Sequence, residues 1–243
     1  MTDAEKLKRI MADPMLWMTS FANIPTKSGK VVKFVPTPQQ KYLMNNKSKY
    51  NIILKSRQAG ISSVIMLYAI YLALTKPNVT CLLMSYRIQS VSENFSKLRA
   101  IYDYLPDAIK KEETANNRTQ LSFINHSKII CCTCSARDNA RGSSIILAHI
   151  SEAGLCKDEN LETQLLAIEQ ALVPGGEVFI ESTARGVNKF HSYWYKAKNK
   201  ESNYKTFFRV LMQNISDNPC QMFIAKKLSN LPISYNFPLG NGL

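Results

Sequence analysis

The sequence predicts a three-layer α/β fold with a central, mostly parallel sheet, and two observations support this prediction. Short apolar strands alternate with amphipathic helices along most of the chain, which is the pattern of a sheet covered by helices. The segment 145–150 is a continuous apolar run, as expected of a central strand that is covered on both faces. The 243 residues allow one large domain, or one domain with a small appendage.

The individual elements follow from apolar periodicity and from helix breakers such as Pro77 and Pro106. The expected strands are 51–55, 79–85, 120–124, 128–134, 145–150, 177–181 and 206–211. The expected helices are 62–75, 87–104, one marked by Leu161, Leu165, Ile168 and Leu172, a basic aromatic one after Gly186, and one starting at Asn218 and Pro219. A hairpin turn is expected at 125–127, a polar loop at 111–118 and a turn at 174–176.

These elements suggest three parts of the chain. Residues 1–35 would form an N-terminal extension that packs on the core, 36–212 the main domain, and 213–243 a C-terminal helix followed by a tail or linker. The lysines at 27, 30 and 33 are expected in a solvated hairpin. No signal peptide opens the chain, and the longest apolar run, 64–74, is shorter than the ~20 residues that span a bilayer, so no membrane partner is expected.

The charge favours a polyanionic partner. The chain carries 31 Lys and Arg against 18 Asp and Glu, a net charge of +13. Such an excess favours nucleic acid through phosphate neutralisation, although a merely soluble basic protein is the alternative, and charge alone does not separate DNA from RNA. With 45% hydrophobic and 20% charged residues the composition is that of a globular domain, which excludes wholesale disorder.

The cysteines are expected as free thiols, because most lie in apolar, strand-like runs typical of a reducing compartment. Cys131 and Cys134 form a C-x-x-C pair, but no second pair stands at the spacing of a zinc site, so a metal site there is disfavoured. The six cysteines are Cys81, Cys131, Cys132, Cys134, Cys156 and Cys220.

The segment 55–63 joins a buried strand to an apolar helix, the setting of a phosphate-binding loop. Backbone N–H groups and the dipole at the start of a helix favour an anion, and Gly60 allows the backbone to approach it closely. Against the pattern G-x-x-x-x-G-K-[ST], Gly60 and Ser62 match, but Ile61 takes the place of the lysine. The cation would instead be Lys55, which enters from the front of the loop. The loop is Lys55, Ser56, Arg57, Gln58, Ala59, Gly60, Ile61, Ser62 and Ser63.

Within this loop, Ser62 is positioned to ligate Mg²⁺, and Arg57 to stabilise charge that develops on the γ-phosphate. An ordinary strand–turn–helix with a basic turn explains the same segment. This loop alone does not decide between the two interpretations. Together with the further segments described next, it predicts ATP and Mg²⁺ as cofactors.

A second segment is the strand 145–150, which runs into Ser151 and Glu152. Nucleotide hydrolases place a metal-binding acid and a water-activating acid at such a strand end. Ser151 stands where an aspartate is usual and would hold Mg²⁺ only weakly, through a water, whereas Glu152 would act as the general base. The alternative is a strand that leaves the core with an exposed Glu. His149 is expected to be a packed core histidine without a catalytic role.

A third strand ends in Ser182, Thr183, Ala184, Arg185 and Gly186. Small hydroxyl residues followed by Arg and Gly at this place would lie beside the same γ-phosphate and couple its presence to a moving part. A capped turn explains the segment equally well when it is taken alone.

The three segments together, in this order, resemble the ATPase domain of phage terminase large subunits, which is a P-loop NTPase of the RecA-like ASCE type. The resemblance covers about 27–230 and includes the step at 140–142 and the segment 36–43, which resembles the adenine-reading glutamine segment of that family. It implies that Gln39 or Gln40 contacts adenine, Lys55 binds phosphates, and Arg57 is an arginine finger in cis. It further implies that Ser62 holds Mg²⁺ and that Glu152 is the general base. Thr183 and Arg185 would couple hydrolysis to movement.

The resemblance also implies a function: an ATP-hydrolysing motor that drives double-stranded DNA into a procapsid in the cytoplasm of an infected bacterial host. A homo-oligomeric ring, a portal protein and a small terminase subunit are implied partners, and the isolated chain is expected as a monomer. No nuclease activity is expected, because Asp217 is the only acid after Phe207. The alternatives are a helicase or remodelling ATPase, and a non-hydrolysing DNA-binding or assembly module whose ATP site has decayed.

The expected helix after Gly186 mixes bases with aromatic residues. Such a mixture tracks a nucleic-acid backbone in some proteins, but an amphipathic helix that packs its aromatic residues on the sheet is the favoured interpretation. Contacts of a motor with duplex DNA are expected at phosphates rather than at base edges. The residues are Arg185, Lys189, Phe190, Tyr193, Trp194, Tyr195, Lys196, Lys198 and Lys200.

Overall fold

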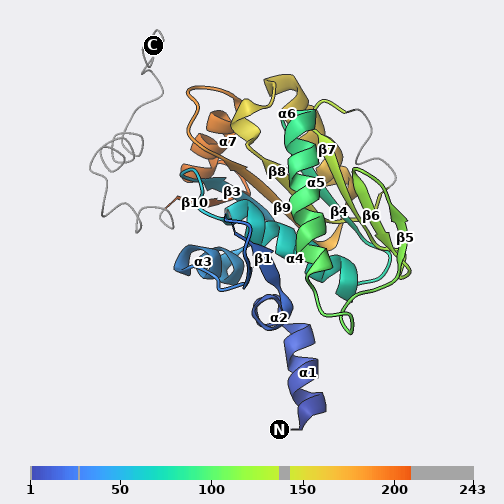
Figure 1. Ribbon diagram of the computed structural model, residues 1–243. Coiled ribbons are helices and arrows are strands. Elements are labelled where there is room, and N and C mark those ends of the chain that lie inside the picture. The colour runs from blue at the N-terminus through green and yellow to red at the C-terminus, as the bar shows by residue number, and fades with distance from the viewer. Residues whose placement is uncertain (1, 27, 137–142, 209–243) are drawn as a thin grey trace.

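The computed structural model describes residues 2–26, 28–136 and 143–208, and within them one eight-stranded sheet lies between two layers of helices (Figure 1). The strand order is β10-β3-β9-β8-β4-β7-β6-β5. All pairs from β10 to β7 are parallel, and β7–β6 and β6–β5 are antiparallel. The predicted three-layer fold with a mostly parallel sheet is confirmed.

The strands of this sheet are short and, in its centre, almost completely buried. They are β3 (Tyr50–Leu54), β4 (Thr80–Ser85), β5 (Glu113–Asn116), β6 (Gln120–Phe123), β7 (Lys128–Thr133), β8 (Ile145–Ser151), β9 (Leu172–Ser182) and β10 (Lys205–Phe207). A separate antiparallel hairpin consists of β1 (Asn23–Pro25) and β2 (Val31–Lys33), as predicted for the basic turn between them.

The helices form two layers, and each layer has its own apolar core. One core joins the sheet to α2, α4 and α5, and the other joins it to α6 and α7. The helices are α1 (Asp3–Ala12), α2 (Pro14–Phe21), α3 (Pro38–Asn46), α4 (Ile61–Thr75), α5 (Ile88–Asp103), α6 (Asp158–Ala171) and α7 (Lys189–Lys198), with a 3-10 turn, η1, at Ala153–Leu155. Among the residues that the structure describes, no helix has both the length and the apolarity to cross a bilayer.

Helix α4 is apolar on all sides because it is enclosed on all sides. Its residues from Val64 to Leu74 are buried between the sheet, α5 and the N-terminal helix α2. Trp17 of α2 is completely buried, and its ring lies edge-on to that of Tyr71 at 5.7 Å. Helix α1 buries no residue and projects from the body of the protein (Figure 1). At its end, however, Ile10 and Met11 pack against the core, and the carbonyl of Met11 accepts a hydrogen bond from the hydroxyl of Tyr71. Both N-terminal helices therefore contact the body of the protein.

Two local predictions were wrong. The expected loop at 111–118 contains β5, whose polar residues lack a strand-like apolar pattern because the strand is at the sheet edge. The expected turn at Pro174–Gly176 is a bulge inside β9, where the register with β8 shifts and Gly175 has φ +77°. The helix expected at Asn218, the end of the strand expected at 206–211 and Cys220 lie outside the described residues.

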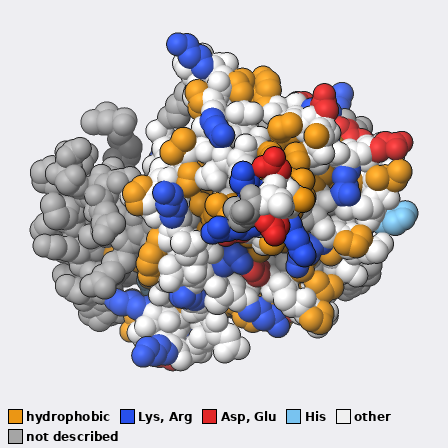
Figure 2. Space-filling view, turned by 90° about the horizontal axis from the view of Figure 1, so that it is seen from below, with side chains coloured by type: hydrophobic (Ala, Val, Ile, Leu, Met, Phe, Trp, Pro, Cys, Tyr) orange, Lys and Arg blue, Asp and Glu red, His pale blue; other side chains and the backbone are white. Residues whose placement is uncertain are grey.

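Figure 2 shows one face, on which Lys and Arg side chains are spread among apolar and neutral ones rather than gathered into one stripe. This face therefore does not by itself mark a path for a nucleic acid.

Candidate active site

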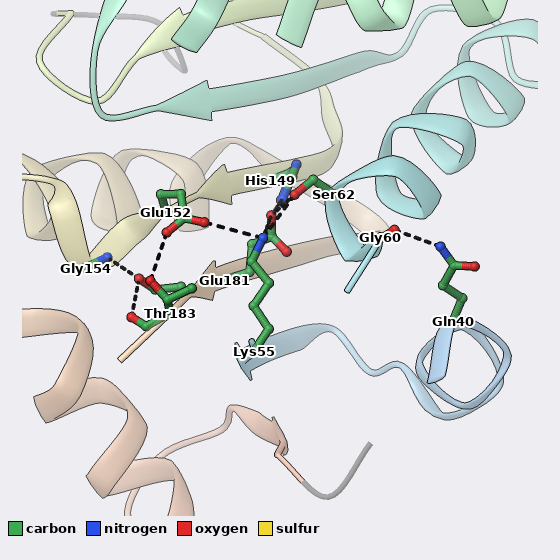
Figure 3. A network of polar contacts seen from close by, with 10 residues as sticks. Gln40, Lys55, Gly60, Ser62, His149, Glu152, Gly154, Glu181 and Thr183 are labelled. Atoms are coloured by element: carbon green, nitrogen blue, oxygen red, sulfur yellow. Dashed lines mark hydrogen bonds and ion pairs between the residues drawn. The ribbon is translucent and has the colours of Figure 1, made fainter. Parts of the chain in front are cut away.

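The three segments singled out in the sequence meet at one edge of the sheet. Strand β9 lies between β3 and β8, and all three are parallel, so their carboxyl ends lie side by side. Lys55 follows β3 and Glu152 follows β8 (Figure 3), and Ser182 ends β9. In α/β sheets ligands bind at this edge of the strands.

The loop between β3 and α4 has the backbone of a close turn. Gly60 has φ +69°, and a Cβ added there would lie 2.7 Å from Nε2 of Gln40, so a larger residue would displace that side chain. The same Nε2 donates a hydrogen bond of 2.8 Å to the carbonyl of Gly60. Helix α4 begins at the next residue, which directs its first N–H groups toward the loop.

Ile61, which stands where a lysine is usual, is 1% exposed and belongs to the core under α4. Ser62 instead faces the carboxyl ends of the central strands, and its Oγ lies 3.3 Å from Nζ of Lys55. The chain therefore places Lys55 beside the start of α4, on the side from which the sequence predicts it to enter. Ser56 and Ser63 are half-buried, and Arg57 and Gln58 are exposed.

Lys55 is held by two carboxylates. Its Nζ lies 3.3 Å from Oε1 of Glu181 and 3.5 Å from Oε1 of Glu152, and its side chain is 9% exposed. Burial works to lower the pKa of Lys55, but the two carboxylates outweigh it, so this pKa lies above its usual value. The lysine is thus a fixed positive charge, partly enclosed, at the mouth of the loop between β3 and α4.

Glu181 was missed as a site residue in the sequence. Its side chain is completely buried at the end of β9, and it accepts a short hydrogen bond from Oγ of Ser62. Nε2 of His149 lies 3.2 Å from the same oxygen, without hydrogen-bond geometry. The available signal was a carboxylate inside an otherwise apolar strand, which is costly unless the charge has partners.

The charge state of Glu181 follows from these partners. Burial works to raise the pKa of this carboxyl, but the charge of Lys55 and the contacts with His149 and Ser62 lower it to about 2. Its second oxygen, Oε2, is buried and has no hydrogen-bond partner among the described residues. A charged carboxylate with one unsatisfied oxygen therefore lies next to Ser62. His149 is buried, as predicted for a core histidine, but it faces this carboxylate.

Glu152 lies at the entrance of the site. It has φ +53°, a left-handed conformation that is uncommon outside glycine, and its side chain is 28% exposed. Its Oε2 lies 3.4 Å from Oγ1 of Thr183, which donates to it. Ser151, one residue earlier, is 7% exposed and ends β8.

The third segment connects this entrance to the next helix. Oγ of Ser182 accepts a hydrogen bond of 3.1 Å from the N–H of Gly154, in the turn that follows Glu152. The carbonyl of Gly154 accepts from the side chain of Asn188, which caps α7. Arg185 and Gly186 are exposed in the loop before that cap. Ser182 and Thr183 are thus brought to Glu152, and Arg185 is not.

The two glutamines of α3 differ in their freedom to bind a ligand. Gln40 is hydrogen-bonded at both side-chain atoms, since its Oε1 accepts from the N–H of Thr37 and its Nε2 donates to Gly60. Gln39 is also buried, but its Oε1 has no hydrogen-bond partner within the described segments. Of the two candidates for contact with adenine, Gln39 therefore has an unused acceptor.

The basic aromatic helix α7 packs as an amphipathic helix. Phe190 is buried, and Tyr193 and Trp194 pack against the core of the α6–α7 layer. Lys189 pairs with Glu162 of α6 at 2.8 Å, and Lys196 is exposed. Its aromatic residues are consequently used for packing, as the favoured interpretation predicts.

The cysteines form no metal site within the described residues, where no group of three or more His, Cys, Asp or Glu side chains is placed to hold an ion. Five cysteines are free thiols, and Sγ of Cys134 lies 2.9 Å from Sγ of Cys156.

Comparison with known proteins gives a result for structure only. Neither a model of a protein family nor a curated protein matches the sequence. Among solved structures, the chain is similar to the large terminase ATPase domain of Thermus phage P74-26, with 15% identity and a TM-score of 0.58 over 86% of this chain and 94% of that chain.

Two longer proteins are also similar. The large terminase of bacteriophage HK97 gives a TM-score of 0.65 with 15% identity over 86% of this chain and 44% of its own. The large terminase of a thermophilic bacteriophage, in complex with ADP, gives 0.55 with 13% identity over 81% and 50%. The chain thus spans about half the length of these two terminases. The predicted resemblance is confirmed at the level of the fold: this chain has the P-loop fold of phage large terminase ATPase domains.

Proposed function

We propose that this chain is an ATP-hydrolysing motor domain of the large terminase type, which moves double-stranded DNA into a procapsid. One observation carries the proposal: Nζ of Lys55 lies within 3.5 Å of both Glu181 and Glu152, and beside Ser62 at the start of α4. A cation, a helix start and a solvent-accessible carboxylate are the groups that a phosphate-transferring site requires.

Each residue of the site would have a separate role in hydrolysis. The first N–H groups of α4 and Nζ of Lys55 bind the β- and γ-phosphates of ATP, because both present positive charge at the loop. Glu152, partly exposed, accepts a proton from the attacking water. Mg²⁺, when bound, neutralises phosphate charge, and Ser62 is the loop residue that would help to hold it. Arg57, exposed in the same loop, would stabilise the charge that develops on the γ-phosphate.

Binding of ATP would change the partners of Lys55. In the described state its charge is shared between Glu181 and Glu152. A phosphate that engages Nζ competes with both carboxylates, and Glu152 is released first because it is the more distant and more exposed one. Glu152 is then available as a base only when nucleotide is present, which limits unproductive proton transfer.

A chain of hydrogen bonds would transmit the release of Glu152 to the rest of the domain. Thr183 contacts Glu152, Ser182 holds the turn after it, and Asn188 joins that turn to α7. A change at Glu152 therefore acts on the position of α7, in keeping with a coupling role for Ser182 and Thr183. Arg185 and Gly186 lie in the exposed loop of the same segment and would contact the γ-phosphate from the solvent side of the site.

Different observations support the proposals that the chain binds a nucleotide and that it binds DNA. The large terminase of the thermophilic bacteriophage has been solved with ADP and with ATP-γ-S, and this chain shares its fold. The net charge of +13 favours a polyanion such as DNA. The ring, the portal and the small subunit, and a location in the host cytoplasm, follow from the terminase resemblance.

Hydrolysis assays test the proposal. We expect wild-type protein to release phosphate from ATP, more so with double-stranded DNA, and Glu152→Gln to lower kcat about 10²–10⁴-fold by removing the base. Lys55→Ala should abolish hydrolysis, whereas Lys47→Ala, at the end of α3 and paired with Glu177, should leave it unchanged. Equal, near-zero turnover in all four proteins, in the presence of DNA, would favour the non-hydrolysing module instead.

A further inference from the structure

Nucleotide hydrolases commonly place a metal-binding carboxylate at the end of a strand such as β8, and here a carboxylate stands one strand away. Residue 151, where an aspartate is usual, is a serine. In the register of the sheet Ser151 lies directly beside Glu181 of β9. The carboxylate is thus displaced sideways by one strand, at the same level of the sheet edge.

Glu181 also has the contacts expected of such a group. It accepts a hydrogen bond from Ser62, the loop residue with a hydroxyl suited to Mg²⁺, and its Oε2 is buried without a hydrogen-bond partner among the described residues. Mg²⁺ is commonly held by one or two protein oxygens together with phosphates and water. A single carboxylate beside one hydroxyl is therefore sufficient on the protein side.

The ion pair with Lys55 gives a physical reason for a cation here. Glu181 is completely buried, and Nζ of Lys55 lies 3.3 Å from its Oε1. When Nζ of Lys55 turns to a nucleotide phosphate, this carboxylate loses much of its compensation, which is costly for a buried charge. A divalent cation bound with the nucleotide would restore the balance.

We infer that Glu181, and not Ser151 or Glu152, supplies the carboxylate that holds Mg²⁺ with the nucleotide, together with Ser62. Glu152 is three-tenths exposed, contacts Thr183 and serves as the base, so it is not available for the metal. This inference rests on the proposed function, because it concerns the metal that accompanies ATP in that same site.

The test measures how strongly the metal tightens nucleotide binding. The dissociation constant for a fluorescent ATP analogue, mant-ATP, is measured with EDTA and with excess Mg²⁺. The ratio of the constant in EDTA to the constant in Mg²⁺ gives the factor by which the metal tightens binding. We expect Glu181→Gln to lower this ratio about tenfold or more. In EDTA the same variant should bind mant-ATP at least as tightly as wild type, because Lys55 has lost a competing carboxylate.

Matched variants separate the candidates for the metal. Ser151→Ala and Glu152→Gln should keep the wild-type ratio within about twofold, a margin well below the loss of a ligand. The double variant Ser151→Asp, Glu181→Gln returns a carboxylate to β8 and should recover most of the ratio. If Glu181→Gln does not fold, Glu181→Asp, which retains the charge on a shorter side chain, should give a reduced ratio with a cooperative melting transition.

The inference is overturned if Glu181→Gln and Glu181→Asp keep the wild-type ratio, or if Ser151→Ala loses as much as Glu181→Gln. These outcomes leave the proposed function intact, since nucleotide still binds. Absence of mant-ATP binding to wild-type protein in both conditions would instead contradict the proposed function itself.

Discussion

Two lysine–glutamate pairs join the segments that flank β3 to glutamates of β9, and their surroundings differ. Before the amino end of β3, Lys47 forms an ion pair with Glu177, whose Oε1 also lies 3.3 Å from the hydroxyl of Tyr68. Nζ of Lys47 lies 4.9 Å from the centre of the Tyr68 ring. At the carboxyl ends, Lys55 is shared between Glu181 and Glu152.

The comparison teaches that the pair itself does not define a phosphate site. Both Glu177 and Glu181 have one buried oxygen without a hydrogen-bond partner in the described segments. The difference lies in the helices: α3 ends at Asn46, directly before Lys47, and so presents its carbonyl end, whereas α4 begins after the Lys55 loop and presents its N–H end. Only the second arrangement favours an anion.

The hollow beside Glu177 supports the same distinction. It measures about 550 Å³ and is lined by Ser48, Lys49 and the bulge of β9 from Leu172 to Glu177. No described helix begins among these residues, so this hollow lacks the N–H groups of a helix start.

The largest difference between the two pairs is expected in nucleotide affinity. Lys55→Ala removes a charged donor from the phosphates, which is worth roughly 1.5–3 kcal/mol, or about a 10- to 100-fold loss of mant-ATP affinity. Lys47→Ala should leave the affinity within about twofold, since it lies at the carbonyl end of α3. An equal loss in both variants would show that the lysines act through the fold and not through the phosphates.

A smaller effect separates two glycines near the same two ends. Gly60 and Gly175 both have positive φ, so alanine at either should destabilise the protein by about 1–2 kcal/mol. Only at Gly60 would the new Cβ meet another group, Nε2 of Gln40 at 2.7 Å. Gly60→Ala should therefore weaken mant-ATP binding roughly tenfold by misplacing the loop, and Gly175→Ala should not. Chemical denaturation and fluorescence titration measure the two effects, and unchanged binding in Gly60→Ala would contradict the role of this turn.

The smallest effect concerns the amino-end pair alone. Tyr68→Phe removes the hydroxyl that contacts Glu177, at a cost of about 1 kcal/mol in the free energy of unfolding. Nucleotide affinity and hydrolysis should not change. A change in either would mean that the two ends of the sheet are coupled, which the contacts described above do not predict.

The sequence was informative where a local pattern is enough. The strand before Lys55, the apolar helix after Gly60 and the strand before Glu152 are set by runs of neighbouring residues, and each was predicted within one or two positions. The candidate phosphate loop could be proposed because its glycine and its lysine are close in the chain, and its role stays a prediction.

The parts that were missed depend on residues distant in the chain. Glu181 looked like the end of an ordinary strand, and its role emerges only because β9 lies between β3 and β8. The strand β5 was missed because it is an edge strand whose residues are polar. The bulge at Gly175 looked like a turn, since a positive φ suits both.

A structure of the protein with ATP-γ-S and Mg²⁺ would test the central claim most directly. The account predicts the nucleotide at the carboxyl edge of β3, β8 and β9, with Nζ of Lys55 at the terminal phosphates, Mg²⁺ between Glu181 and Ser62, and Glu152 released toward water. A nucleotide bound elsewhere on the molecule, or Lys55 still paired with both glutamates in its presence, would contradict it.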